Sequence, residues 1–213
     1  MLQRDDAFET TERVYRVTLN PERWRTLDRI RRELGDETQI AEALAFLGEP
    51  ADLDPATLPD LLRDPFHRTP FPSDRRFSNG EFGVLYTART AQTAGYEYAH
   101  WAPRNFAPAP GEPVRVRLHL ISATFQGPVI DVCPFVDEWP WLISDDYTEC
   151  QKLGAAAHAE GLGALFAPSA RHRPDGVTVP IFLIDAAADP KIEGDVVFIV
   201  SATEPITFDI QLV

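Results

Sequence analysis

Cysteine, basic residues and long apolar runs are all scarce in this sequence. Its 213 residues include two cysteines, Cys133 and Cys150, which are too few for a disulfide framework or a four-thiolate zinc site. No apolar run approaches the roughly 18 residues that a membrane-spanning helix needs, and the opening segment MLQRDDAFET lacks the apolar stretch of a secretory signal. These absences favour a protein of the reducing cytoplasm with no membrane contact.

The shortage of basic residues gives the chain an acidic balance. It has 20 Lys and Arg against 33 Asp and Glu, a net charge of −13. Proteins that bind nucleic acid directly normally present a basic face to the phosphates, so we expect no nucleic-acid partner. A cluster of arginines near the N-terminus is best explained as a solvated helix face, with a surface for an acidic partner as the alternative: Arg23, Arg25, Arg29, Arg31 and Arg32.

Three acidic residues, Asp145, Asp146 and Glu149, form the kind of cluster that binds metal ions. They lie at the predicted start of a helix, where capping and the helix dipole both favour carboxylates. Because that placement explains all three, we expect no metal site.

The length and an apolar fraction of 44% suit one domain with a full core. We predict a single domain over 1–213, with a helical and proline-rich insertion at 20–70. Within the insertion, Asn20-Pro21 is typical of a helix start and predicts a helix to about residue 34. A second helix is expected over 39–47, and the prolines between 50 and 72 predict a connecting segment with one turn of helix after Asp54-Pro55.

The rest of the chain is rich in predicted strands. Alternating or short apolar segments predict them at 13–18, 82–87, 114–120, 129–132, 164–167, 177–184, 196–201 and 206–212. Thr90 is expected to cap a helix over 91–101, and Asp145 or Asp146 a helix that ends at Gly161. The order is not a repeated βαβ unit, so we predict an α+β fold with a mostly antiparallel sheet.

The helix after Thr90 carries one charged residue on its apolar face. Ala94, Glu97, Tyr98 and Trp101 follow the spacing of a buried stripe, and burying an unpaired carboxylate is costly. Two explanations stay open. Glu97 is either a structural carboxylate, paired with an arginine or rotated towards solvent, or a functional carboxylate in the wall of a cleft.

Arg76 and Tyr86 flank a predicted turn at Asn79-Gly80. A hairpin-like return there brings the two side chains together beside the helix that carries Glu97. A guanidinium binds phosphate oxygens with a bidentate fork, a phenol stacks on a ring, and a carboxylate orients hydroxyl groups. The three residues together therefore indicate a site for a ribose phosphate.

These motifs resemble the RES domain, a family named for its Arg, Glu and Ser residues. Four segments match in order between residues 13 and 200, outside the insertion. They are Val14-Tyr15-Arg16; Arg76-Phe77-Ser78-Asn79-Gly80 with Gly83-Val84-Leu85-Tyr86, Thr93-Ala94 and Glu97; Asp145-Asp146-Tyr147-Thr148-Glu149-Cys150-Gln151; and Gly161-Leu162-Gly163-Ala164-Leu165 with Pro168-Ser169-Ala170-Arg171. The sequence departs from the family where Phe77-Ser78 replaces the commoner Trp-Asn, which bears on the choice of acceptor.

The resemblance implies an ADP-ribosyltransferase-like fold around a cleft for NAD, which these proteins consume as substrate. Family members are toxins of bacterial toxin–antitoxin pairs, and an antitoxin partner with an Xre-like helix-turn-helix region holds them inactive. Some degrade NAD by hydrolysis or phosphorolysis, and at least one transfers ADP-ribose to a protein, phosphoribosyl pyrophosphate synthetase. All three reactions begin with cleavage of the nicotinamide–ribose bond.

The resemblance also assigns residues. Arg76, Tyr86 and Glu97 match the family's pocket residues, Arg16 its N-terminal arginine, and Ser169 its serine. Thr148 stands where some members have a pocket serine. Glu97 would stabilise the oxocarbenium-like transition state. Arg76 and Arg16 would bind the phosphates, and Tyr86 would stack on nicotinamide or its ribose.

The alternative from another class is a catalytically idle RES-like module that only binds a partner. Retention of Arg76, Tyr86 and Glu97 argues against it, because an idle copy has no chemical need for all three.

Overall fold

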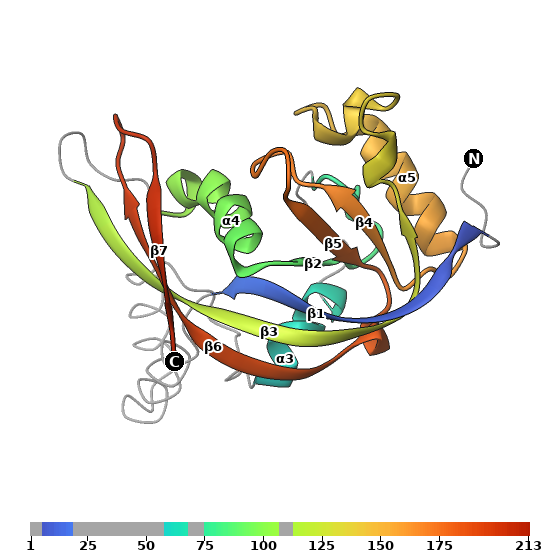
Figure 1. Cartoon of the computed structure of the whole chain (residues 1–213), viewed down its shortest axis with the longest axis horizontal. Helices are drawn as coiled ribbons and strands as arrows, with labels where there is room; N and C mark the ends of the chain where they lie inside the picture. Colours follow the sequence, from blue (N-terminus) through green and yellow to red (C-terminus); the bar gives the residue numbers. More distant parts are fainter. Residues whose placement is uncertain (1–5, 19–57, 68–74, 107–112) are drawn as a thin grey trace, which may run out of the picture.

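The computed structural model describes residues 6–18, 58–67, 75–106 and 113–213. Seven strands form one sheet: β1 (Phe8–Thr18), β2 (Leu85–Ala88), β3 (Val114–Asp131), β4 (Ala164–Pro168), β5 (Val177–Ile181), β6 (Ala187–Val200) and β7 (Thr207–Leu212). Within these ranges, three α-helices, α3 (Leu58–His67), α4 (Ala91–Phe106) and α5 (Thr148–Ala159), pack on the sheet (Figure 1). Short 3₁₀ helices lie at Cys133–Phe135, Pro140–Ile143 and Ile184–Ala186.

The strand order is β1-β2-β5-β4-β3-β6-β7, and β1 also pairs with β3. The first five strands of that order therefore close on themselves, and β6 and β7 extend the sheet beyond the ring. Every pairing is antiparallel except that of β3 with β4. The predicted α+β class with a mostly antiparallel sheet is confirmed.

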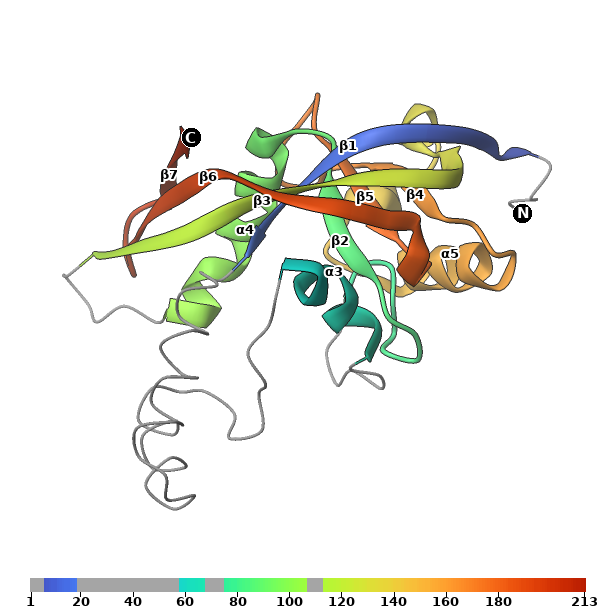
Figure 2. The ribbon, with the colours of Figure 1, turned by 90° about the horizontal axis from the view of Figure 1, so that it is seen from below.

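The long strand β3 joins the two parts of the sheet. Residues 119–129 pair with β1, residues 114–125 with β6, and residues 129–131 with β4. In Figures 1 and 2, β1, β3 and β6 follow one long curve. The sequence predicted two separate strands here, at 114–120 and 129–132, with Gly127-Pro128 between them. Gly127 instead continues the strand opposite Thr10 of β1, at a φ of 149°.

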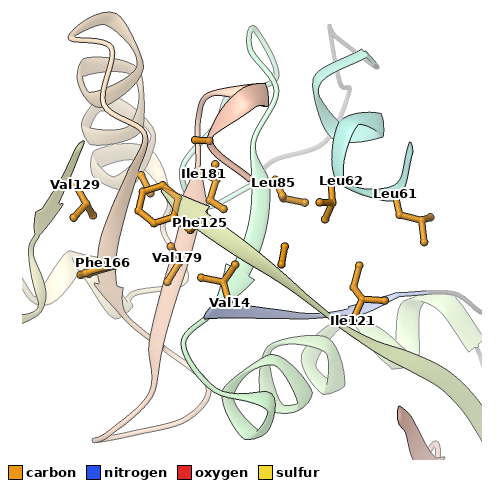
Figure 3. Close-up of a cluster of buried hydrophobic side chains, with 13 residues drawn as sticks. Val14, Leu61, Leu62, Leu85, Ile121, Phe125, Val129, Phe166, Val179 and Ile181 are labelled. Carbon is orange, nitrogen blue, oxygen red and sulfur yellow. The ribbon is translucent and has the colours of Figure 1, made fainter. Parts of the chain in front are cut away.

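Helix α3 is longer than the single helical turn predicted after Asp54-Pro55 in the connecting segment over 50–72. Pro59 lies in the first turn, where a backbone N–H has no partner within the helix. Leu61 and Leu62 are buried with Val14 and Ile121 in the cluster of Figure 3. Burial of this apolar face stabilises the helix although Pro65 lies within it. The helices predicted over 20–34 and 39–47 lie outside the described residues.

Helix α4 begins where the sequence predicted, whereas α5 begins one or two residues later than predicted, with Tyr147 rather than Asp145 or Asp146 at its N-cap position. The hydroxyl of Thr90 accepts a hydrogen bond from the N–H of Thr93 (3.1 Å), and α4 then runs to Phe106, beyond the predicted end. Asp146 accepts from the N–H of Thr148 (3.0 Å) at the start of α5. The chain leaves α5 through Gly161, whose φ is 69°. No helix among the described residues is long and apolar enough to cross a membrane.

Candidate active site

Glu97 and Ser169 form the centre of the site. Glu97 lies half-buried in the middle of α4, and Ser169, which has no exposed surface, directly follows β4. The Ser169 hydroxyl donates a hydrogen bond of 2.6 Å to Oε1 of Glu97, across 72 residues of sequence. The structural explanation that the sequence left open for Glu97 was either an arginine partner or rotation of the side chain towards solvent. The structure gives it a serine instead.

The loop that carries Ser169 fixes the direction of this bond. Ser169 Oγ accepts from the N–H groups of Arg171 (3.1 Å) and His172 (2.9 Å). Because both of these contacts supply a hydrogen, the hydroxyl's own hydrogen is directed to Glu97. The loop closes with two further backbone hydrogen bonds of 2.7 Å, from Ser169 N to Gly176 O and from Gly176 N to His172 O.

Arg76 is bound to the segment that precedes α5. Its Nη1 donates to the carbonyls of Leu142 (3.1 Å) and Ser144 (2.6 Å). Its Cζ lies 4.7 Å from the ring centroid of Tyr147, a cation–π contact. The guanidinium is therefore held in place from two sides.

Arg171 joins this segment to the Ser169 loop, and sequence reasoning gave it no role. Its guanidinium forms an ion pair with Asp145 and a hydrogen bond with the side chain of Tyr147. The hydrogen bond and charge of Arg171 hold the pKa of the Asp145 carboxyl below its usual value. Contacts thus run without interruption from Glu97 through Ser169, Arg171 and Tyr147 to Arg76. The sequence signal that could have indicated a role for Arg171 was its position two residues after Ser169.

Tyr86 lies next to Phe77, the residue after Arg76. The chain return predicted at Asn79-Gly80 brings these two segments together. The Tyr86 hydroxyl accepts a hydrogen bond of 3.0 Å from the N–H of Phe77, and burial raises its pKa. Arg75 lies over its ring, with Cζ 5.8 Å from the centroid. The neighbour over the ring is therefore Arg75, a residue to which the sequence assigned no role.

Arg16 enters from β1 and donates from Nη1 to the carbonyl of Tyr86 (3.3 Å). Burial and the charge of Arg75 lower its pKa to about 10. Its Nε is buried and has no hydrogen-bond partner among the residues that the structure describes. A desolvated guanidinium with a spare donor, close to a second arginine, has the chemistry of an anion-binding group. The charge of the Asp64 carboxylate acts in the opposite direction and favours a higher pKa for Arg16.

Thr148 lies apart from this set. It is exposed in the first turn of α5, and its hydroxyl donates to Asp146 (2.7 Å). Within the described ranges, no contact joins it to Glu97 or Ser169, so its hydroxyl acts at the start of the helix. Across the same ranges, no group of three or more His, Cys, Asp and Glu side chains is arranged to hold a metal ion.

Comparisons with known proteins give the following matches. The model of the RES domain family matches residues 52–209. No curated protein sequence matches the chain. Among solved structures, it is similar to a chain in the crystal structure of the M. tuberculosis MbcT–MbcA toxin–antitoxin complex, with 18% identity, a TM-score of 0.47, and coverage of 89% of this chain and 90% of that chain.

Proposed function

Because this chain belongs to the RES domain family, we propose that it is an enzyme that cleaves NAD at the nicotinamide–ribose bond and transfers ADP-ribose to an acceptor. The acceptor class we favour is a protein, such as phosphoribosyl pyrophosphate synthetase. Transfer to water or to phosphate, which would deplete NAD, is the alternative outcome of the same cleavage.

The observation that carries the proposal is the Glu97–Ser169 pair. A half-buried carboxylate with one oxygen bound at 2.6 Å by a fixed hydroxyl is pre-oriented and needs little reorganisation when charge develops beside it. Cleavage of a glycosidic bond develops positive charge at the anomeric carbon. A carboxylate of this kind is the group that stabilises such a charge.

In the proposed reaction, the bond between the nicotinamide nitrogen and the anomeric carbon breaks. Nicotinamide leaves as a neutral molecule with the bonding electron pair, so the step needs no general acid. An acceptor oxygen or nitrogen then bonds to the anomeric carbon and loses its proton to solvent. Glu97 stabilises the cationic transition state, Arg16 and Arg76 bind the phosphates, and Tyr86 contacts nicotinamide or its ribose.

The test is nicotinamide release from labelled NAD, measured together with label on protein. Glu97→Gln keeps the size of the side chain and an acceptor for Ser169 but removes the charge, so release should fall by orders of magnitude. Glu160→Gln, at an exposed position after α5, is the matched control. Unchanged release from a folded Glu97→Gln variant would reject the role of Glu97. No release from the wild-type protein would favour an idle partner-binding module.

We further propose that the protein is the toxin of a toxin–antitoxin pair, as the family resemblance implies, and that an Xre-like antitoxin inhibits it. Since Arg16 and Arg76 supply positive charge to the site, an acidic or carboxylate-ended segment of the antitoxin would compete with the phosphates of NAD. Titration of the antitoxin against NAD in a binding assay tests this. Equal NAD affinity in the free protein and in the complex would contradict occlusion.

A further inference from the structure

His172 lies next to the Glu97–Ser169 pair but belongs to none of the motifs discussed above. Its backbone N–H donates to Ser169 Oγ (2.9 Å). Its imidazole Nδ1 is 2.9 Å from the hydroxyl of Thr93, and its ring stacks on Tyr96, with centroids 4.6 Å apart and an interplanar angle of 24°. The backbone of His172 therefore contacts the serine, while its side chain contacts helix α4.

The partners of the imidazole are themselves fixed. Thr93 is 1% exposed, and its hydroxyl hydrogen-bonds to that of Thr90 (2.8 Å), the residue that caps α4. Thr93 is four residues before Glu97, so both lie on one side of the helix, about one turn apart. The ring thus binds the first turn of the helix that presents the carboxylate.

A single hydrogen bond between the Ser169 loop and helix α4 would not by itself prevent rotation of the loop about that bond. The Ser169–Glu97 bond is such a contact, and the contact of His172 with Thr93 and Tyr96 adds a second point of attachment about one turn away. A second point restricts rotation of the loop about the first bond and so limits the direction of the serine hydroxyl relative to the carboxylate.

We propose that the Thr93–His172 hydrogen bond positions Ser169 and Glu97 for the reaction, with Thr93 and His172 as positioning residues that do not touch the substrate. This inference rests on the proposed NAD cleavage. A misplaced catalytic group reduces the rate of the chemical step strongly even when substrate still binds. Loss of the bond should therefore lower kcat for nicotinamide release and leave KM nearly unchanged.

The matched variants are Thr93→Val, which removes the hydroxyl at nearly constant shape, and Thr93→Ser, which keeps it. We expect kcat to fall about tenfold in Thr93→Val and to recover to within about twofold of wild type in Thr93→Ser. His172→Phe keeps a ring to stack on Tyr96 but loses Nδ1, and should match Thr93→Val. Thr178→Val is the control, because the Thr178 hydroxyl bonds to the Ala167 carbonyl (3.2 Å), outside this contact.

Amide hydrogen exchange tests the positioning without any activity. The N–H groups of Arg171 and His172, which donate to Ser169 Oγ, should exchange faster in Thr93→Val and His172→Phe than in wild type or Thr178→Val. Failure of the wild type to release nicotinamide would reject the proposed function while the exchange measurement still decides this inference. Unchanged exchange in both folded variants, or equal kcat in Thr93→Val and Thr93→Ser, would overturn it.

Discussion

Ser169→Ala removes one oxygen atom from the site and should destabilise the protein more than the loss of the Glu97 charge does. Ser169 is fully buried, and its hydroxyl makes three hydrogen bonds, one donated to Glu97 and two accepted from the N–H groups of Arg171 and His172. Alanine fits the same space but satisfies none of these groups. The variant therefore isolates the polar contribution of the hydroxyl.

The magnitude follows from the groups left without a partner. A buried donor that loses its acceptor costs about 1–3 kcal/mol. The two N–H groups are only partly buried, which places each near the lower end of that range. Glu97 is half-buried and regains water on its free oxygen. The free energy of unfolding should fall by roughly 2–3 kcal/mol.

Urea unfolding measures this loss directly. With an m value of about 2 kcal/mol/M, the midpoint of Ser169→Ala should move down by about 1–1.5 M at unchanged m. Glu97→Gln is the comparison, because its amide oxygen still accepts from the Ser169 hydroxyl. It should cost less than about 1 kcal/mol, although both variants lose nicotinamide release. A loss in Ser169→Ala no greater than that in Glu97→Gln would refute this account of the loop.

Three further outcomes are expected. Arg76→Lys keeps the charge but loses the planar fork, so calorimetry should show NAD binding weakened by about tenfold. In Gly154→Ala the new Cβ would lie 2.1 Å from the carbonyl oxygen of Phe77; urea unfolding should show a net loss of about 2 kcal/mol despite the better helix propensity of alanine. A hydrogen bond from Ser122 and the neighbouring Arg13 hold the pKa of Glu193 below its ordinary value of 4.5. The stability that the Glu193 carboxylate contributes is therefore present above pH 4.5 and is lost as the pH falls through the lowered pKa. Glu193→Gln should therefore flatten the fall of Tm between about pH 5 and 3.

Features set by neighbours in sequence were predictable. The Thr90 cap of α4, the start of α5 near Asp146 and its exit at Gly161 all depend on residues within one helical turn. The strand predicted at 13–18 lies within β1, which extends from Phe8. Closure of the ring by pairing of β1 with both β2 and β3 depends on residues far apart in sequence, so no local pattern indicates it.

Features set by burial were not predictable from local signals. Helix α3 forms in spite of Pro59 and Pro65, because the apolar face that contains Leu61 and Leu62 packs against the sheet. β3 continues through Gly127-Pro128 because β1 supplies a partner at both positions. In each case a tertiary contact outweighs a local signal that normally ends the element.

The candidate site divides in the same way. The sequence and its family resemblance selected Glu97, Ser169 and Arg76, but not which residue each one contacts. One of the alternatives left open for Glu97 paired it with an arginine, whereas the structure supplies Ser169. Arg171 and His172 were given no role, because each acts through a loop whose closure by Gly176 no local pattern indicates. Their closeness to Ser169 in the sequence was the available signal.

The arginines of the site differ in how much of their hydrogen-bonding capacity the fold already uses. Arg76 donates to two carbonyls, and Arg171 is paired with Asp145, so substituting either one alters the loops around the site as well as its charge. Loss of activity in such a variant cannot by itself identify a phosphate ligand. Arg16 is different, because its Nε is buried without a partner among the described residues and its pKa is lowered to about 10 by burial and by Arg75. An anion placed there would satisfy the free donor and offset the repulsion between the two cations. We therefore propose Arg16, rather than Arg76 or Arg171, as the position at which to test for a phosphate ligand, with Asp64 as the carboxylate that already offsets part of its charge.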